Sequence, residues 1–577
     1  MISRIVSKII VVMLIAACLP LGGVQADESA RPAALPGPML TVNFAAPQHA
    51  ISDDIYGMNF TQDALADELD LTVVRWGGNA TTRYNYLVDA DNRGSDWFFE
   101  NINSNHPNPA ILPEGSAADL FVQQNNSFGA DTILTVPLIG WVTKDRNQGC
   151  GFAVSLYGPQ QSTDYWRPDC GNGVTTGGVK ITWNNPTDTS IPADHTFVQG
   201  WVEHLVAEHG TAANGGVRFY ALDNEPMIWH ETHRDVHPNG ATYDEVLNKG
   251  IATALAIKTE DPSAQVLGPV LFGWTAYWVS GAEMAQGGAW WNNLFDRAAH
   301  GGMPFLPWYL QQMAQAEVDE GQRLLDYLDI HYYPQAAGVT LAPAGDAATQ
   351  ARRLRSTRSL WDPTYVDESW IGTSGTEGGP YVRLIPRMRE WIDTYYPGTK
   401  LAITEYNWGG VEHINGALAQ AEVLGIFGRE RVDLATLWDP PSSSQPAAYA
   451  FRMYRNYDGA GSKFGSLSVA ASSSDASVVS IFAAHRPGDN VLTVMLINKT
   501  GSEYTSTLNV SSFVANASAA RYQYSGANLN AIVPLANVAI SGGSASVTLP
   551  PNSITLLEIP GVAIAYTDFV YLPLVRR

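Results

Sequence analysis

Short apolar runs alternate with amphipathic stretches from the N-terminal region to about residue 455. Each run ends in polar or aromatic residues, and segments such as 195–210 and 386–396 carry apolar residues at helical spacing. Short apolar runs closed by turn residues predict buried strands, whereas the 3.6-residue repeat predicts amphipathic helices. The eight predicted strands cover residues 55–60, 72–78, 131–141, 217–226, 264–274, 324–334, 400–408 and 433–440.

The alternation of eight strands with helices predicts an α/β fold class, a (β/α)8 TIM-like barrel. An open doubly wound sheet is the alternative, but eight units spread over about 400 residues favour the barrel. We place the catalytic barrel at residues 38–455. Within it, segment 38–50 contains an extra apolar strand, 39–44, which is a candidate strand of the domain that follows the barrel.

The character of the sequence changes after residue 455. Ser, Ala, Val, Thr and Asn dominate residues 456–560, and segment 477–499 has the pattern of two strands around a Pro-Gly-Asp-Asn turn. This pattern predicts a C-terminal all-β sandwich domain. Its one aromatic cluster, Tyr-Gln-Tyr at 522–524, favours packing against the barrel over polysaccharide binding. The C-terminal tail, 561–577, has no pattern that assigns it a structure.

Residues 1–26 have the layout of a secretory signal peptide. Two basic residues precede an apolar run at 9–19, and Val-Gln-Ala at 24–26 offers a cleavage site. The alternative is a lipoprotein anchored at Cys18, because Ile-Ala-Ala-Cys at 15–18 resembles a lipoprotein box. No later stretch is apolar enough over a sufficient length to span a bilayer. We therefore expect a secreted, extracellular protein.

Export leaves two cysteines, Cys150 and Cys170, in a loop region rich in Gly, Asn and Asp. An oxidising compartment favours their pairing, so we predict a disulfide that closes this loop. Zinc is disfavoured because no His lies at ligand spacing from the two cysteines.

The formal net charge of −22 limits the partners of the protein. A strongly negative surface repels nucleic acid and anionic membranes, and no Lys/Arg cluster offsets it. A neutral substrate is the partner most compatible with this net charge. We expect no nucleic-acid partner, no membrane span and a monomer.

In a barrel of this kind, side chains at the carboxyl ends of the strands face one common site. Two predicted strand ends carry a glutamate, Glu225 in Asp-Asn-Glu-Pro and Glu405 in Thr-Glu-Tyr-Asn-Trp. Asp223 is expected to face the barrel wall or a neighbouring loop. Aromatic and amide side chains occupy the other ends. The candidate substrate-binding residues are Asn59, Trp76, Asn79, Trp141, Asn224, Trp229, Trp274, His331, Tyr332, Tyr406, Trp408 and Trp438.

This combination of side chains suits glycoside hydrolysis. One carboxylic acid protonates the leaving oxygen, and a second carboxylate meets the positive charge that develops at the reacting carbon. Trp and Tyr rings stack on sugar faces, and amides bond sugar hydroxyls. A solvated turn for Glu225 or a structural ion pair for Glu405 is the alternative. The chain has neither the G-x-S-x-G pattern of a serine hydrolase nor a phosphate-binding P-loop.

Five long motifs resemble glycoside hydrolase family 44: IYGMNF, RWGGNATTRYNY, LDNEPMIWH, DIHYYPQ and ITEYNWGG. The resemblance covers roughly residues 40–455 and implies an endo-β-1,4-glucanase or xyloglucanase. By motif, Glu225 corresponds to the acid/base after strand 4 and Glu405 to the nucleophile at the end of strand 7. The family retains anomeric configuration, which implies carboxyl groups about 5–5.5 Å apart. Glu225 would then stay protonated near neutral pH, because the charge of Glu405 raises its pKa.

Two further patterns are candidate metal sites. Some relatives in the family carry a calcium ion, and the Asp/Asn-rich segment 89–97 is a candidate for such structural calcium, with a solvated loop as the alternative. His230, His233 and His237 would share a helix face, but the segment is not HExxH and polar loop or substrate contacts are favoured. We expect that catalysis requires no cofactor.

Two other functions remain open. The chain could be a mannanase or xylanase of the same barrel clan, or a noncatalytic carbohydrate-binding protein. The noncatalytic alternative predicts that one glutamate is missing or replaced, whereas both are present. The long loop at 144–173, which contains the two cysteines, could form one wall of the cleft.

Overall fold

The computed structural model describes residues 34–563. The predicted signal peptide, the alternative anchor at Cys18 and most of the C-terminal tail lie outside these residues. No helix between residues 34 and 563 combines the length and the apolar character needed to cross a membrane.

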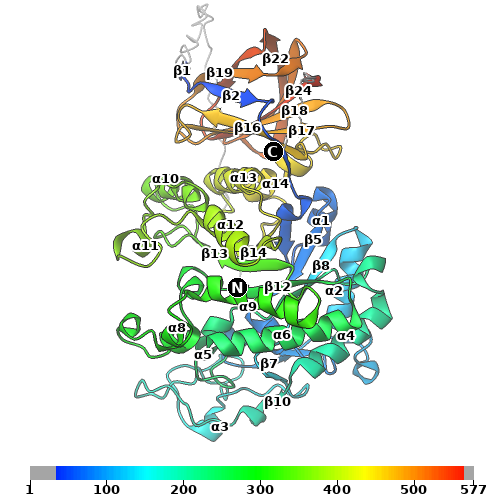
Figure 1. The fold of residues 1–577 in the computed structure, drawn as a ribbon, viewed down its shortest axis with the longest axis vertical. Coiled ribbons are helices and arrows are strands. Elements are labelled where there is room, and N and C mark those ends of the chain that lie inside the picture. The colour runs from blue at the N-terminus through cyan, green and yellow to red at the C-terminus, as the bar shows by residue number, and fades with distance from the viewer. Residues whose placement is uncertain (1–33, 564–577) are drawn as a thin grey trace, which may run out of the picture.

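Eight parallel strands close into a barrel, and each corresponds to one of the predicted strands (Figure 1). Around the ring they follow the order β11, β12, β13, β14, β15, β4, β5 and β8. The predicted barrel is therefore confirmed, and an open sheet is excluded. The strands are β4 (Gly57–Asn59), β5 (Val73–Trp76), β8 (Asp131–Val136), β11 (Phe219–Leu222), β12 (Gln265–Leu271), β13 (Tyr327–Tyr332), β14 (Lys400–Tyr406) and β15 (Leu434–Leu437).

Apolar side chains fill the interior of the barrel, and helices cover its outer surface. On α4 (His195–His209) the buried residues Val198, Trp201, Val202 and Leu205 follow the i, i+3, i+4, i+7 spacing of one helix face. The other long helices are α2 (Ala117–Ser127), α6 (Tyr243–Glu260), α9 (Phe305–Glu320), α10 (Ala347–Ser356), α12 (Leu384–Tyr395), α13 (Ile414–Arg429) and α14 (Pro446–Arg455). The interior cluster consists of Val73, Ile133, Phe219, Ala221, Leu267, Val270, Tyr327, Ala402 and Leu434.

A separate β-domain lies at one end of the molecule, beside α13 and α14 of the barrel's helix layer (Figure 1), and confirms the predicted C-terminal β-structure. Its core is distinct from that of the barrel. β2 (Leu40–Asn43) pairs antiparallel with β16 and parallel with β19, so the segment before the barrel is part of this sheet. The other strands are β1 (Leu35–Pro36), β3 (His49–Ala50), β16 (Leu467–Ser473), β17 (Val479–Arg486), β18 (Val491–Asn498), β19 (Tyr504–Ser511), β20 (Phe513–Ala515), β21 (Ser518–Ser525), β22 (Asn528–Ser541), β23 (Ser544–Leu549) and β24 (Ser553–Ala563).

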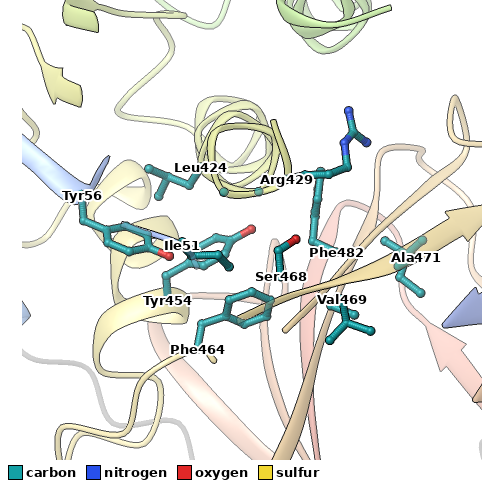
Figure 2. A pocket seen from close by; sticks show the side chains of 14 residues that line it. Ile51, Tyr56, Leu424, Arg429, Tyr454, Phe464, Ser468, Val469, Ala471 and Phe482 are labelled. Carbon is teal, nitrogen blue, oxygen red and sulfur yellow. The ribbon is translucent and has the colours of Figure 1, made fainter. Parts of the chain in front are cut away.

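The two domains pack closely through α13 and α14. Tyr524 stacks on Tyr449 of α14 with 4.7 Å between ring centroids, and Tyr522 packs on Tyr457 at 4.8 Å. The Tyr-Gln-Tyr cluster thus contacts the barrel, as expected. The space between α13 and the sheet is a cavity of about 20 Å³ lined mainly by apolar side chains (Figure 2). A cavity of this size holds about one water, which excludes a ligand site there.

The loop between β8 and α4 contains the two cysteines, and the predicted disulfide Cys150–Cys170 is present with 5.6 Å between the Cα atoms. The loop also contains β9 (Trp141–Thr143), α3 (Val154–Tyr157) and β10 (Ser190–Pro192). Figure 1 shows α3 and β10 at the end of the molecule far from the β-domain.

Candidate active site

A strained turn at the end of β11 positions Glu225. Asp223 and Glu225 have positive φ angles of 67° and 50°, which non-glycine residues adopt rarely. The buried carboxylate of Asp223 accepts hydrogen bonds from the Thr82 hydroxyl at 2.7 Å and the Ile139 N–H at 3.0 Å. Asp223 thus binds a neighbouring loop, as predicted. The Glu225 N–H donates to the carbonyl of Val270 at 2.9 Å.

Val270, which accepts this hydrogen bond, lies in an irregular part of β12. Its φ is 54°, an outlier for a β-branched residue, and the pairing of β12 with β13 shifts register between Pro269 and Leu271. Such a bulge redirects the groups at the end of a strand, and bulges occur often near active sites. Backbone strain of this kind is held in place only by well-packed surroundings.

Glu405, at the end of β14, is 5% exposed and held by two donors. Its Oε1 accepts from Arg75 Nη1 at 2.8 Å, and its Oε2 accepts from the Tyr333 hydroxyl at 2.8 Å. The Arg75 side chain comes from β5 and is fully buried. Charge-assisted bonds to a buried carboxylate are strong and fix its orientation.

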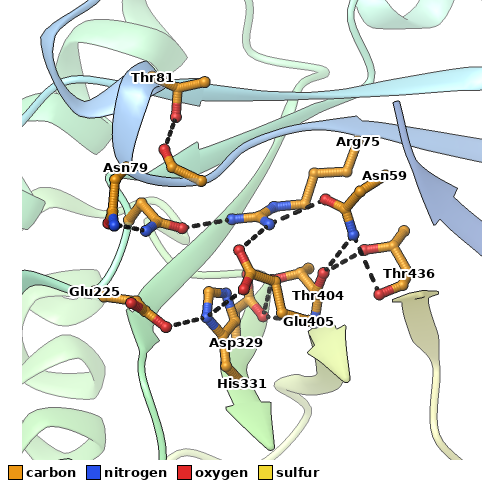
Figure 3. A network of polar contacts seen from close by, with 12 residues as sticks. Asn59, Arg75, Asn79, Thr81, Glu225, Asp329, His331, Thr404, Glu405 and Thr436 are labelled. Carbon is orange, nitrogen blue, oxygen red and sulfur yellow. Dashed lines mark hydrogen bonds and ion pairs between the residues drawn. The ribbon is translucent and has the colours of Figure 1, made fainter. Parts of the chain in front are cut away.

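His331, on β13, lies between the two glutamates (Figure 3). Its Nδ1 is 2.8 Å from Glu225 Oε1 and 3.5 Å from Glu405 Oε2. One side-chain N or O atom from each of these three residues lies within 4.8 Å of the others. The structure therefore brings the two predicted catalytic carboxyl groups face to face.

Arg75 connects this group to three amide side chains. Its Nη1 donates to Asn59 Oδ1 at 3.1 Å, and its Nη2 donates to Asn224 Oδ1 at 3.0 Å. Asn224 Nδ2 in turn donates to Asn79 Oδ1 at 3.1 Å. Arg75 was not among the predicted site residues, although an arginine inside the apolar run Val-Val-Arg-Trp is a signal, because a buried charge needs a partner.

Burial determines the protonation of the site. It raises the pKa of Glu225 to about 7, and the positive charge of Arg75 partly opposes this rise. Burial lowers the pKa of His331 to about 3, so its imidazole is neutral at neutral pH. Beneath the site, burial raises the pKa of Asp329 to about 7. Glu225 can therefore exchange a proton near neutral pH, as a general acid/base must.

The His331 and glutamate group also has the composition of a metal site. However, the Arg75 guanidinium already binds Glu405 and places a positive charge beside the group, which opposes a second cation. The Arg75–Glu405 salt bridge thus suits a role of the Glu405 carboxylate that needs no metal ion.

The other candidate metal residues form contacts within the protein. Asp96 accepts two hydrogen bonds from Asn79, and Asp91 pairs with Arg93 at 2.9 Å. Calcium binding by segment 89–97 stays a prediction. Among the histidines, His237 binds Glu245 at 2.9 Å. Between residues 34 and 563, the three histidines predicted as an alternative metal site form no group with metal-ligand geometry.

Five aromatic residues predicted to stack on substrate are buried, and that prediction is wrong for them. Tyr406 accepts a hydrogen bond from Gln420 of α13, which shows that its ring points outward into the helix layer. A ring that packs on both faces leaves no surface for a sugar. The five residues, each at most 3% exposed, are Trp229, Trp274, Tyr332, Tyr406 and Trp408.

Asn59 also has a different role from the predicted one. Its Nδ2 lies within 3.3 Å of three main-chain carbonyl oxygens, and its Oδ1 accepts from Arg75. These contacts occupy the polar atoms of a residue that is 1% exposed. We therefore correct the prediction: Asn59 positions Arg75.

Half-buried aromatics remain candidates for substrate contact. Trp438 lines two neighbouring cavities, one shared with Phe60 and Leu341 and one shared with Asn79 and Trp97. Trp76 packs against Phe60 with centroids 5.7 Å apart. Phe60 and Trp97 were not among the predicted substrate-binding residues. Substrate contact by Trp76 and Trp141 stays a prediction.

A further aromatic cavity lies on the opposite side of the ring. It opens among loops that follow β12 and β13 and is lined by Trp278, Trp290, Trp291 and Trp370, among others. Two hydrogen bonds connect it to the main chain of Tyr333, the residue whose hydroxyl binds Glu405. Trp370 Nε1 donates to Gln335 Oε1 at 3.2 Å, and Gln335 Nε2 donates to the Tyr333 carbonyl at 2.8 Å. This cavity was not predicted from the sequence.

Comparisons with known proteins agree with this geometry. A family model described as glycoside hydrolase family 44 matches residues 90–336. The structure of CelM2, a bifunctional glucanase-xylanase from a metagenome library, is 46% identical with a TM-score of 0.87. The alignment covers 91% of this chain and 99% of that one. Cel44A, a family 44 endoglucanase from Clostridium thermocellum, is 30% identical with a TM-score of 0.74, and the coverage is 90% and 99%.

Two longer proteins also match. Endoglucanase A of Paenibacillus lautus is 35% identical over 472 residues, and Beta-mannanase/endoglucanase A of Caldicellulosiruptor saccharolyticus is 32% identical over 488 residues. Each match covers 80% of this chain, but only 63% and 34% of the length of those relatives. With its barrel, its paired glutamates and full-length structural matches of 30% identity or more, the chain belongs to glycoside hydrolase family 44.

Proposed function

We propose that the protein is a secreted, retaining endo-β-1,4-glucanase that cleaves the backbones of cellulose derivatives and xyloglucan by double displacement. The observation that supports the mechanism most directly is the proximity of Glu225 and Glu405, with oxygens within 4.8 Å. Retaining enzymes hold their carboxyl groups about 5–5.5 Å apart, whereas inverting enzymes leave about 6.5–9.5 Å for a water molecule.

In the first step, a Glu405 oxygen attacks the anomeric carbon and the bond from that carbon to the glycosidic oxygen breaks. Its electron pair goes to the leaving oxygen, which takes the proton of Glu225. Arg75 and Tyr333 hold Glu405 for this attack. Asn224, fixed by Arg75, can hold a sugar hydroxyl beside the reacting carbon.

In the second step, Glu225 removes a proton from water as the water oxygen attacks the glycosyl-enzyme. The bond to Glu405 breaks, and its electron pair returns to the carboxylate. A pKa near 7 lets Glu225 act as acid in the first step and base in the second. The neutral His331 contacts Glu225 without adding a charge.

The substrate class rests on the shape of the site and on the names of relatives. Aromatic cavities on opposite sides of the carboxylates suit a chain that passes across the barrel mouth, which is what endo-cleavage requires. A Paenibacillus polymyxa protein that is 29% identical is described as a family 44 xyloglucanase. A neutral glucan is also compatible with the net charge of −22.

The stereochemistry of the first product tests the mechanism. Proton NMR during cleavage of a cellooligosaccharide should show the β-anomer first, and initial release of the α-anomer would reject a retaining mechanism. The variants Glu405→Gln and Glu225→Gln should each lose at least about 1,000-fold in kcat while keeping the unfolding temperature of the wild type.

Azide distinguishes the two roles, because a small anion can fill the space that an alanine leaves. Glu225→Ala with azide should form a β-glycosyl azide, since the intermediate on Glu405 still forms. Glu405→Ala with azide should form the α-glycosyl azide, because azide attacks in place of the nucleophile. The reverse pattern would exchange the two assignments.

A second candidate is a mannanase or xylanase, which the names of two relatives favour: one is a glucanase-xylanase and the other a β-mannanase/endoglucanase. Reducing ends released from carboxymethylcellulose, xyloglucan, mannan and xylan separate the candidates. We expect kcat/KM to be highest on a β-1,4-glucan. No release from any polymer, together with binding to one, would favour a noncatalytic carbohydrate-binding protein.

A further inference from the structure

The loop closed by the disulfide displays two strongly exposed aromatic side chains. Tyr165 is 87% exposed and Trp166 is 73% exposed, in a loop whose neighbouring cysteines are buried. The Trp166 ring stacks on Trp97, with 5.7 Å between centroids and 29° between planes. Tyr165 meets Trp166 edge to face at 5.8 Å. We call Trp97, Tyr165 and Trp166 the aromatic platform.

The platform is continuous with the candidate active site. Trp97 lines the cavity that also contains Asn79, Asp96 and Trp438. Asn79 binds both Asp96, the neighbour of Trp97, and Asn224, the neighbour of Glu225. Rings that begin in this cavity and extend onto the loop therefore lead outward from the carboxylates.

Several contacts anchor the loop beneath the exposed rings. Besides the disulfide, Arg167 pairs with Glu100 at 2.9 Å, and Glu100 is 1% exposed. The Arg167 N–H donates to Asp164 Oδ2 at 3.0 Å, and the Asp164 N–H donates to the Cys170 carbonyl at 2.9 Å. An anchored loop loses less conformational entropy when a ligand binds than a loop without such contacts.

We propose that the aromatic platform is a distal binding site for the polysaccharide chain, so that the disulfide loop makes the enzyme prefer long substrates. This inference rests on the proposed function. A sugar chain is the occupant that fits, because the platform extends a cavity where rings alternate with amide and carboxylate groups, and sugars stack on such rings.

Chain-length dependence tests the proposal. The variants Trp166→Ala and Tyr165→Ala should lower the ratio of kcat/KM on soluble xyloglucan to kcat/KM on a short aryl cellobioside. The loss of one stacking contact corresponds to about a tenfold change in that ratio for Trp166→Ala. The matched control is Leu156→Ala, because Leu156 is 64% exposed in the same loop but takes no part in the ring stack. This control should leave the ratio within twofold.

A binding measurement separates failure of this proposal from failure of the proposed function. Affinity electrophoresis in xyloglucan gels compares the variant Glu405→Gln with the double variant Glu405→Gln/Trp166→Ala, and the double variant should be retarded several-fold less. An active wild type with an unchanged ratio and unchanged retardation in the Trp166 variants would overturn the distal site. A wild type that cleaves no polysaccharide would instead overturn the proposed function.

A second copy of the chain is the competing occupant. Sedimentation velocity over a range of concentrations tests it directly. Association that disappears in Trp166→Ala, with unchanged xyloglucan retardation, would overturn the proposal in favour of a dimer contact. A monomer at all concentrations would support it.

Discussion

A single buried arginine organises the residues around the nucleophile candidate. Arg75 contacts Glu405, Asn59 and Asn224 through two of its nitrogen atoms. Its planar fork satisfies partners in fixed directions, which the flexible ammonium of a lysine cannot reproduce. Burial raises the pKa of Glu225, and the positive charge of Arg75 lowers it, which limits the rise. Arg75 therefore affects both geometry and protonation, and two substitutions separate these effects.

We predict that Arg75→Lys and Arg75→Gln each reduce kcat by about 100-fold, because the carboxylate loses its orientation. Only Arg75→Gln removes the positive charge, so only this variant should move the basic limb of the kcat/KM profile to higher pH. The measurement is kcat/KM from pH 4 to about 9 on one soluble substrate, with melting curves as a folding check. Identical limbs in the two variants would contradict an electrostatic role.

Glu225 should reveal its raised pKa in both activity and stability. As general acid it must be protonated, so kcat/KM should fall as pH rises through about 7. Its folded pKa lies above the unfolded value, so its stabilising contribution is complete below about pH 4.5. That contribution is lost as pH rises toward about 7.

The variant Glu225→Gln cannot ionise and should escape this loss. Relative to wild type, its free energy of unfolding should increase between about pH 4.5 and 7, by up to about 3 kcal/mol, and then stay constant. Urea denaturation at several pH values measures the difference. A constant difference across this range would show that Glu225 titrates normally.

At the scale of residues, the sequence predicted that Glu225 and Glu405 lie in one site. Each glutamate lies at the end of an apolar run, a position with few structural roles for a carboxylate. The sequence did not predict the orientation of the side chains beside them. Tyr406 is the last residue of β14 and Trp408 lies two residues beyond it, and both rings point outward, toward α13 and α10. Inside the strand, Tyr406 points to the face opposite Glu405 because successive side chains alternate. Beyond the strand this alternation stops, so the direction of Trp408 depends on the turn and on tertiary packing.

At the scale of elements, the turn after β11 depends on Asp223. Its carboxylate satisfies the N–H of Ile139 in the loop after β8 and the hydroxyl of Thr82. Burial raises its pKa to about 6. The two neighbouring barrel loops are therefore joined through one side chain, directly beside Glu225.

We predict that Asp223→Ala destabilises the protein by about 3 kcal/mol, because it leaves buried N–H groups without acceptors. It should also lower kcat, because the turn that carries Glu225 loses its anchor. Asp223→Asn, which keeps one acceptor oxygen, should have a smaller effect on both quantities. Urea denaturation and steady-state kinetics of the pair measure this, and equal effects would contradict the anchoring role.

The disulfide loop gives a second prediction at this scale. Replacing both cysteines, Cys150→Ser/Cys170→Ser, should raise KM for a polymer more than KM for a short aryl glycoside, because the aromatic platform loses its fixed position. The lost constraint on a closed loop of this length is worth up to about 3 kcal/mol. Thermal unfolding and chain-length kinetics measure the two effects. Normal polymer kinetics in this variant would show that other contacts hold the loop.

Elements were predictable where one local pattern specified them. All eight barrel strands follow from short apolar runs, and the disulfide follows from the cysteine count and the expected export of the chain. The bulge at Val270 could not be predicted, because a β-branched residue with positive φ contradicts its own local preference. In that conformation the Val270 carbonyl accepts the hydrogen bond from the Glu225 N–H, a contact between different elements of the fold.

At the scale of the molecule, the β-domain covers part of the helix layer around the barrel. The face of α13 that would otherwise meet solvent packs on the sheet, and every residue from Ile414 to Gly428 is buried. β2 precedes the barrel in sequence but pairs with β16 and β19, so the β-domain is built from both sides of the barrel sequence. The sequence indicated this strand by its apolar pattern, although its partners are distant along the chain.

One buried ion pair joins the two domains. Lys499 Nζ of the β-domain is 3.2 Å from Glu422 Oε1 of α13, and their side chains are 7% and 6% exposed. The Ser480 hydroxyl donates to the same oxygen at 2.8 Å. Desolvation of two charges costs about as much as their attraction returns, so the pair is sensitive to the loss of one partner.

We predict that Glu422→Ala destabilises the protein by about 3 kcal/mol, because it leaves the Lys499 charge buried without a partner. The double variant Glu422→Met/Lys499→Met should regain most of that loss, since neither charge then needs solvation. Equilibrium denaturation of the single and double variants measures the coupling energy. The exposed pair Lys180–Glu231, at 2.7 Å and 53% and 54% exposed, gives the control, and Glu231→Ala should change stability by less than about 0.5 kcal/mol. If Glu422→Ala were as mild as Glu231→Ala, water would reach the domain interface, and the β-domain would contribute less to the barrel than its packing on α13 indicates.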